Sequence, residues 1–212
     1  MSKTYLITRP EHDDTTHYLS KWSKDTLSLA EEKEFKVLDL PREKANKIEV
    51  ESKLMKFSQD LVVFNGHGDD NTVTGHKNEQ LITAGKNETL LKNKIIYAIS
   101  CRSAKILGEK SVKAGAISYS GYDEDFVFVY DPNKITIPCS DSTAKLFLEH
   151  SQIFIESIIK GNTIEESKKK AENILRKNII RLLGSNQDSS LVRYLWWDLK
   201  HFVSLGNMNA IV

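Results

Sequence analysis

The sequence has few of the features that mark secreted, membrane or nucleic-acid-binding proteins. Two cysteines, Cys101 and Cys139, occur in 212 residues, too few for a disulfide framework, so we expect a reducing, cytoplasmic location. No apolar run approaches membrane-spanning length, and the first residues, MSKTYLITRPEHDD, lack the apolar core of a signal peptide. The 30 Lys and Arg residues and 29 Asp and Glu residues leave a net charge of +1. This balance gives no electrostatic reason to expect nucleic acid or an acidic membrane as a partner.

What is present is an ordinary globular composition, with 40% hydrophobic and 28% charged residues. A chain of this length builds one sizeable core. We see no internal repeat and no clear domain boundary, so we predict a single domain over residues 1–212. The best linker candidate is GSNQDSS, Gly184–Ser190, and a C-terminal helical extension over 185–212 is the one subdivision left open.

Short apolar runs alternate with helical patterns along the chain. The apolar runs predict strands at Thr4–Thr8, Phe35–Leu40, Asp60–Asn65, Lys94–Ser100, Ala116–Gly121 and Phe126–Tyr130. The helical patterns cover Asp13–Lys33, Glu43–Phe57, Ser103–Lys113, Ser142–Lys160, Thr163–Leu183 and Ser190–Leu205. A small β-hairpin is expected in the polar segment Asp69–Asn93. This alternation predicts an α/β fold with a mostly parallel sheet, and the continuous apolar strands indicate that helices cover both sheet faces.

Two reactive side chains directly follow two of these strands. His67 stands between two glycines after LVVFN, and Cys101 follows KIIYAIS. Functional groups gather at the carboxyl ends of parallel strands, which lie about 4.8 Å apart when they are neighbours. A thiol beside an imidazole is a nucleophile with its base, and a helix beginning after Cys101 would lower the pKa of that thiol. The backbone N–H groups of Gly68 and Cys101 are candidates for an oxyanion hole.

The same residues have an ordinary structural interpretation. A glycine-flanked histidine can be a turn residue, and a cysteine after a strand is often a small buried apolar residue. Because each half of a Cys–His pair follows its own apolar strand, the functional interpretation is favoured. Cys139, in IPCSDS, has no histidine visibly presented to it, and we expect it to be structural.

The two motifs resemble the caspase-like clan of cysteine peptidases. LVVFNGHG followed by KIIYAISCRSA is similar to the clan's signature, a hydrophobic block ending in His-Gly and a later one ending in Cys, and the prokaryotic CHAT and gingipain-like branches look closest. The resemblance covers Thr4 to about Tyr130. It implies a caspase-like three-layer sandwich with a mostly parallel central sheet and a helical C-terminal portion. It also implies a cysteine endopeptidase that forms a thioester acyl-enzyme, with Cys101 as nucleophile and His67 as general acid/base. The caspase pentapeptide Gln-Ala-Cys-x-Gly is absent, which leaves the branch and the substrate open.

In this clan the residue before the cleaved bond is usually charged and meets an opposite charge. Candidate substrate-binding residues are Arg102, which would receive an acidic side chain, and the loop acids that would receive Lys or Arg: Asp69, Asp70, Asp123, Glu124 and Asp125. Loop acids are often simply solvated, and we lean to basic specificity. The expected partner is a protein or peptide substrate. A regulator would be a separate protein, or a segment-level switch such as cleavage in Asp131–Ser140 or Gly184–Ser190.

No cofactor and no catalytic metal are expected. The candidate metal ligands His67, Asp69, Asp70 and His76 lack the spacing of HExxH and similar motifs, although a loop-bound Ca²⁺ at Asp69–Asn71 stays open. Two other functions also stay open: a non-catalytic caspase-like or flavodoxin-like module that binds a partner, and an α/β domain that binds a small ligand. An inactive relative would usually have lost His67 or Cys101, which favours the enzyme. The aromatic tail Leu191–Asn207 is expected to pack in the core, with a partner surface as its alternative.

Overall fold

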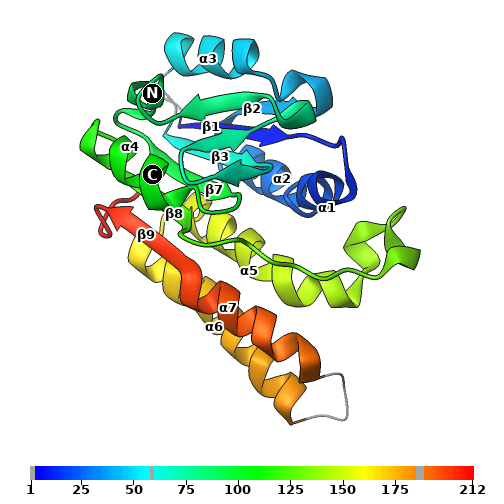
Figure 1. The fold of residues 1–212 in the computed structure, drawn as a ribbon. Coiled ribbons are helices and arrows are strands. Elements are labelled where there is room, and N and C mark those ends of the chain that lie inside the picture. Colours follow the sequence, from blue (N-terminus) through cyan, green and yellow to red (C-terminus); the bar gives the residue numbers. More distant parts are fainter. Residues whose placement is uncertain (1–2, 58–59, 185–188) are drawn as a thin grey trace.

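The computed structural model describes residues 3–57, 60–184 and 189–212. Its centre is a six-stranded sheet with the order β2-β1-β3-β7-β8-β9 (Figure 1). The strands are β1 (Thr4–Arg9), β2 (Lys36–Pro41), β3 (Leu61–Asn65), β7 (Ile95–Ile99), β8 (Ser118–Tyr122) and β9 (Phe202–Gly206). The first five run parallel, and β9 runs antiparallel to β8. The predicted α/β fold with a mostly parallel sheet is therefore confirmed.

Helices cover both faces of this sheet, as the continuous apolar strands predicted. The helices are α1 (Asp14–Trp22), α2 (Asp25–Glu32), α3 (Lys47–Lys56), α4 (Glu109–Lys113), α5 (Ser142–Ile159), α6 (Ile164–Leu183) and α7 (Val192–His201). One face packs against α1, α2 and α5, and the other packs against α3 and α4 (Figure 1). Short 3-10 turns lie at Arg42–Lys44, His76–Asn78, Glu88–Leu91, Pro132–Lys134, Pro138–Ser140 and Ser189–Leu191.

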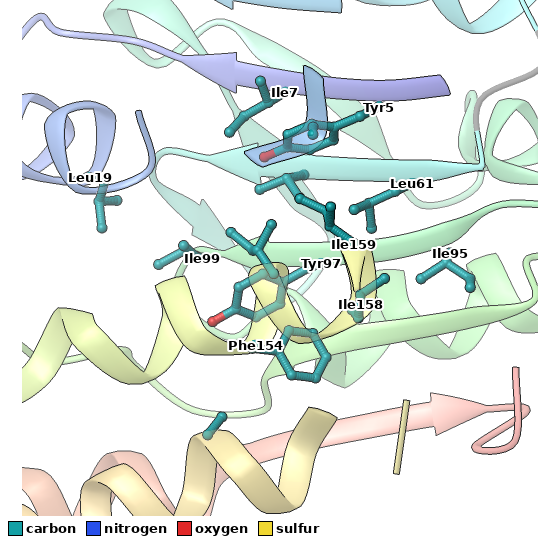
Figure 2. Packing of buried hydrophobic residues seen from close by; sticks show 14 of the residues in the cluster. Tyr5, Ile7, Leu19, Leu61, Ile95, Tyr97, Ile99, Phe154, Ile158 and Ile159 are labelled. Carbon is teal, nitrogen blue, oxygen red and sulfur yellow. The ribbon is translucent and has the colours of Figure 1, made fainter. Parts of the chain in front are cut away.

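Each central strand divides its side chains between two cores. In β7, Tyr97 and Ile99 belong to the core under α5. Ile96 and Ala98 belong to the core under α3 instead. Figure 2 shows the first core, where the rings of Tyr97 and Phe154 have centroids 4.7 Å apart. Burial on both faces explains why these strands are continuously apolar rather than alternating.

A pair of helices continues the structure beyond α5. α6 packs along α5, and α7 packs along α6 (Figure 1). An apolar cluster joins the three helices: Leu146, Phe147, Leu175, Ile179, Leu182, Leu195 and Leu199. The predicted helical C-terminal portion is therefore present, and its tail packs in a core as expected. Trp196 lies on the outside of this pair, with 56% of its surface exposed.

The sixth strand of the sheet is not the one that the sequence predicted. Phe126–Tyr130 is irregular in the structure, and the edge position belongs to β9, which begins within the predicted helix Ser190–Leu205 and ends at Gly206. The segment has an alternating apolar pattern because every second side chain packs against the core under α5, namely those of Phe126, Phe128 and Tyr130. The backbone of this segment does not join the sheet, whose edge β9 already occupies.

Other boundaries differ at the ends of elements. The predicted helix Asp13–Lys33 is two helices, α1 and α2, and the predicted helix Ser103–Lys113 begins as a π-helical turn, Ala104–Gly108, before α4. The expected hairpin is a small antiparallel sheet of β4 (Gly68–Asp69), β5 (Thr72–Thr74) and β6 (Gln80–Thr83). Most of the linker and cleavage candidate Gly184–Ser190 lies outside the described residues. Within the described ranges, none of the helices combines the length and apolar character needed to cross a bilayer.

α5 buries a histidine in the core beside β8. The hydroxyl of Tyr122 lies 2.5 Å from Nε2 of His150. Burial lowers the pKa of His150 from 6.5 to about 4, against the smaller opposing effect of a hydrogen bond from its ring to the backbone carbonyl oxygen of Phe147. The unfolded chain therefore binds a proton more readily than the native state between these two values.

His150→Gln should make the protein less sensitive to mild acid. In the wild type, the free energy of unfolding should fall by on the order of 3 kcal/mol as the pH drops from about 6.5 to about 4, because protonation favours the unfolded chain. Glutamine keeps an acceptor for the Tyr122 hydroxyl but does not titrate. Urea unfolding at a series of pH values measures the effect. The same acid sensitivity in both proteins would contradict the assignment to His150.

Candidate active site

The carboxyl ends of β3 and β7 bring His67 and Cys101 to one pocket. The two strands pair in parallel up to Asn65 and Ile99. The N–H of Gly66 then donates to the carbonyl oxygen of Ile99 at 3.3 Å, which continues the pairing past the strand ends. His67 and Cys101 both line a pocket of about 260 Å³. The other lining residues are Thr15, Leu19, Gly66, Ser100, Phe126, Val127 and Phe128.

Gly66 allows the chain to leave β3 close to β5. Its φ is +157°, and a Cβ at this position would lie 2.2 Å from the backbone oxygen of Thr74. Beyond the glycine, both the N–H and the hydroxyl of Thr74 donate to the carbonyl oxygen of His67, at 2.9 and 3.0 Å. The backbone of His67 is therefore held on one side by β5.

The side chain of His67 is held by a carboxylate that the sequence analysis did not identify. Oδ2 of Asp13 lies 2.7 Å from Nε2 of His67. The other oxygen of Asp13, Oδ1, accepts the N–H of Thr16 at 2.8 Å and caps α1. Burial raises the pKa of Asp13, but the hydrogen bonds from Thr16 and His67 together outweigh it, so that the pKa lies below its usual value.

A sequence signal for Asp13 was present. Asp13 and Thr16 have the spacing of a capping box at the start of a helix, and the structure forms that box. This helix follows β1, which pairs with β3 in the sheet. If the pairing of β1 with β3 had been known, it would have predicted that Asp13 and His67 lie at the same edge of the sheet.

The Cys101 thiol is partly buried beside the Phe126–Phe128 segment. Its Sγ donates to the carbonyl oxygen of Phe126 at 3.9 Å. Burial raises the pKa of Cys101, and the charge of Asp125 adds to the rise, while a hydrogen bond from the backbone of Phe126 to the sulfur and the charge of Arg102 oppose it. The predicted lowering of this pKa by a following helix is therefore wrong.

The physical reason lies in the backbone donors that follow Cys101. The N–H of Arg102 donates to the carbonyl oxygen of Glu124 at 3.1 Å. Those of Ile106 and Leu107 both donate to the carbonyl oxygen of Asp70, at 3.2 and 2.9 Å. Arg102 also has a φ of +53°, which turns the chain before the π-helical turn begins. These N–H groups are satisfied by the protein instead of stabilising a thiolate.

Most of the predicted substrate-binding residues gather in a second hollow. It has a volume of about 360 Å³ and is lined by Asp69, Asp70, Asn71, Arg102, Lys105 and Glu124. Arg102 lies 3.0 Å from Asp70 and 3.3 Å from Asp125, measured between charged atoms. Lys105 lies 3.8 Å from Asp70 and 3.7 Å from Glu124. The hollow therefore holds a network of ion pairs of both signs.

Other predicted residues have contacts of their own. Oδ1 of Asp123 lies 2.8 Å from Nδ1 of His201, outside this hollow. Oδ1 of Asp69 accepts the N–H of Asn71 at 2.8 Å. Among the described residues, three metal-ligating side chains converge at His12, Asp13 and His67. The suggested calcium loop Asp69–Asn71 stays a prediction. Cys139 lies away from the pocket, where its thiol donates to the carbonyl oxygen of Lys21 at 3.7 Å.

α7 holds the pocket wall that contains Val127. Oδ1 of Asp198 accepts the N–H of Val127 at 3.0 Å. The indole N–H of Trp197 donates to the carbonyl oxygen of Asp125 at 2.8 Å. Burial raises the pKa of Asp198 well above its usual value, with the Val127 bond opposing the rise. The C-terminal helix thus reaches back to the segment that contacts the thiol.

The fold is similar to that of the Arg-specific cysteine proteinase gingipain R (RgpB). That structure matches 99% of this chain and 47% of its own, with a TM-score of 0.66 and 10% sequence identity. A complex of the RgpB pro- and mature domains from Porphyromonas gingivalis matches 99% of this chain and 48% of its own, with a TM-score of 0.63 and 10% identity. This chain thus spans about half the length of the solved structures it matches. The predicted caspase-like fold is confirmed at the level of the fold alone.

The sequence comparisons give no further assignment. No protein-family model matches the chain, and no curated protein matches it. The CHAT branch suggested by the motifs therefore stays a prediction.

Gly66→Ala should lower the free energy of unfolding by more than Gly161→Ala does. Gly161 has a φ of +84°, but no described atom lies within 4 Å of an added Cβ, so we expect a loss of about 1–2 kcal/mol from backbone strain alone. Gly66 adds a contact of 2.2 Å with backbone oxygen. Urea unfolding of both variants tests this comparison. An equal or smaller loss for Gly66→Ala would show that the approach of β5 is not tight.

Asp198→Asn should preserve the pocket wall, whereas Asp198→Ala should loosen it. The asparagine oxygen still accepts the N–H of Val127. Because the native pKa of Asp198 is raised, ionisation destabilises the fold as the pH rises past the unfolded value, and the asparagine variant should gain stability over the wild type with rising pH. The alanine variant should lose about 1–3 kcal/mol for its unpaired donor. Urea unfolding across pH and amide exchange at Val127 measure both effects, and a wild type and asparagine variant with parallel pH profiles would contradict the role of Asp198.

Proposed function

We propose that this chain is a cysteine peptidase with Cys101 as nucleophile and His67 as general acid/base. The observation that carries the proposal is that both side chains line one pocket at adjacent strand ends, with Asp13 2.7 Å from His67. Nucleophilic catalysis of this kind needs a nucleophile, a base that takes its proton and a third group that orients the base. The similarity of the fold to that of a cysteine proteinase adds support.

The raised pKa of Cys101 favours base assistance over a preformed thiolate. A thiol that rests protonated needs a base when the substrate binds. Asp13 engages Nε2 of His67, so we assign Nδ1 to receive the thiol proton. The carboxylate then stabilises the imidazolium that forms.

In the proposed reaction, Sγ of Cys101 attacks the carbonyl carbon of the scissile peptide bond while His67 takes the thiol proton. His67 gives this proton to the leaving amine as the C–N bond breaks, which leaves a thioester. A water molecule then attacks the thioester while His67 takes a proton from this water. His67 passes that proton to the sulfur of Cys101 as the acid product leaves. We propose the N–H groups of Gly68 and Cys101 as donors to the oxyanion. A Cβ on Gly68 would lie 3.0 Å from that of Ser100, and this close approach of the two strand ends supports the pairing.

For the cleaved bond we propose a preference for a preceding Lys or Arg. The second hollow and its rim carry more carboxylates than cations: Asp69, Asp70, Glu124 and Asp125 against Arg102 and Lys105. A Lys or Arg side chain of the substrate would replace Arg102 or Lys105 as an ion-pair partner of these carboxylates. An acidic substrate side chain would instead meet net negative charge. The Arg specificity of gingipain R points the same way. Asp123, paired with His201, would act on the hollow only through its loop.

We further propose that residues 1–212 work as one domain, because α7 bonds to the pocket wall through Asp198 and Trp197. The partner would be a protein or peptide substrate, with a separate regulatory protein as a second partner. The structure of mature RgpB in complex with its pro-domain supports the proposal of such a regulator. A cytoplasmic location is consistent with the free thiols of Cys101 and Cys139.

Peptidyl electrophiles ending in Lys, Arg or Asp should label the wild type at one site. Intact mass should show a single adduct that is lost in Cys101→Ala and kept in the matched control Cys139→Ala. His67→Ala should slow labelling by on the order of 10²-fold or more, because the thiol loses its base. Probes ending in Lys or Arg should react faster than the probe ending in Asp.

Each other outcome has a defined meaning. Labelling of Cys139 instead would refute the nucleophile, and faster reaction of the Asp-ended probe would refute only the basic preference. No adduct with any probe would favour the alternative function, a non-catalytic caspase-like or flavodoxin-like module that binds a protein partner or small ligand. The raised pKa of Cys101 is the one observation on the side of that alternative.

A further inference from the structure

The proposed base belongs to a cluster of ligand-type side chains that the peptidase reaction does not use in full. His12, Asp13 and His67 each place one ligand atom within 4.8 Å of the others. Oδ2 of Asp13 lies 2.7 Å from Nε2 of His67 and 3.4 Å from Nε2 of His12. Two imidazole nitrogens therefore converge on one carboxylate oxygen beside the pocket.

We propose that His12, Asp13 and His67 form a reversible Zn²⁺ site and that the bound ion switches the peptidase off. The binding half of this proposal stands on the cluster alone. The inhibitory half rests on the proposed function, because it requires His67 to be the base.

The donor set favours a transition-metal ion such as Zn²⁺ over Ca²⁺ and Mg²⁺. Two histidines and one carboxylate, with a fourth position for water, are a common zinc set, whereas Ca²⁺ and Mg²⁺ prefer oxygen ligands. Zinc bonds of about 2.0–2.1 Å place tetrahedral ligand atoms about 3.4 Å apart, so atoms already within 4.8 Å need only small side-chain movements. Asp13 can bind through Oδ2 while Oδ1 keeps the cap on Thr16.

His12 supplies a second observation. Its side chain is only 11% exposed, and its Nδ1 is buried without a hydrogen-bond partner among the described residues. The ring of His76 packs edge-on against it with centroids 5.5 Å apart, and Asn78 lies 3.2 Å from its Nε2. A buried polar atom without a partner costs about 1–3 kcal/mol. Either nitrogen of an imidazole can bind zinc. If the ring turns so that Nδ1 faces the cluster, the ion becomes the partner that this nitrogen lacks among the described residues.

The chemistry of His67 explains why the ion would inhibit. An imidazole that binds zinc through Nε2 keeps its proton on Nδ1, so it has no lone pair left to accept the proton of Cys101. The ion also takes the carboxylate of Asp13 that would stabilise an imidazolium. His12 and Asp13 lie outside the residues that line the pocket. Zinc should therefore lower kcat while leaving KM largely unchanged.

Calorimetry on a chain without the nucleophile tests the site itself. Zn²⁺ titrated into Cys101→Ala should bind once per chain, and Co²⁺ should give the visible absorption of a tetrahedral site. Adding His12→Ala should weaken both by about tenfold or more. Adding His17→Ala, a partly exposed histidine in α1 outside the cluster, should change neither. No binding, or equal binding with and without His12, would overturn the site.

Activity of the full chain tests the switch. Zn²⁺ should reduce the cleavage rate of a Lys- or Arg-containing peptide, and a chelator should restore it. His12→Ala should keep the basal rate and lose the zinc sensitivity, which separates this site from zinc bound directly to the thiol. Zinc inhibition that persists in His12→Ala, or an unaffected wild type, would overturn the switch. If the wild type cleaves no peptide, the proposed function fails, and calorimetry alone decides the metal site.

Discussion

The parallel register of β3 and β7 is the constraint on which the rest of the site depends. Asn65 pairs with Ile99, so the two chains leave the sheet side by side, and His67 and Cys101 each follow within two residues. A shift of one residue would turn the buried side chains of a strand to the opposite face. The two cores on either side of the sheet therefore hold the register, and with it the position of His67 and Cys101 at one pocket.

Around this pair, the protein uses each supporting group for more than one purpose. Asp13 caps α1 with one oxygen and orients His67 with the other. Asp198 lies in a helix that closes an apolar cluster, yet it also holds the backbone of Val127 at the pocket. The stability of these secondary elements and the geometry of the site are thus coupled, because removing one acceptor affects both.

The outcome of the sequence predictions follows from the range of the interactions involved. The central strands were predicted to within about two residues because burial on both faces makes them apolar throughout. Phe126–Tyr130 has a strand-like pattern for a different reason, since its aromatic side chains pack on a core while its backbone bonds to α7. The thiol pKa was predicted from an assumed free helix end, whereas Asp70 and Glu124 accept the relevant N–H groups.

The sequence by itself determined the α/β class, the five parallel strands and the positions of His67 and Cys101 directly after β3 and β7, because apolar patterns and strand ends are local properties. Tertiary structure alone decided that Asp13 orients His67, that α7 holds the pocket wall and that burial raises the pKa of Cys101. The first two contacts join residues 54 and 71 positions apart. Such contacts depend on which elements become neighbours in the folded chain, and no local pattern specifies that.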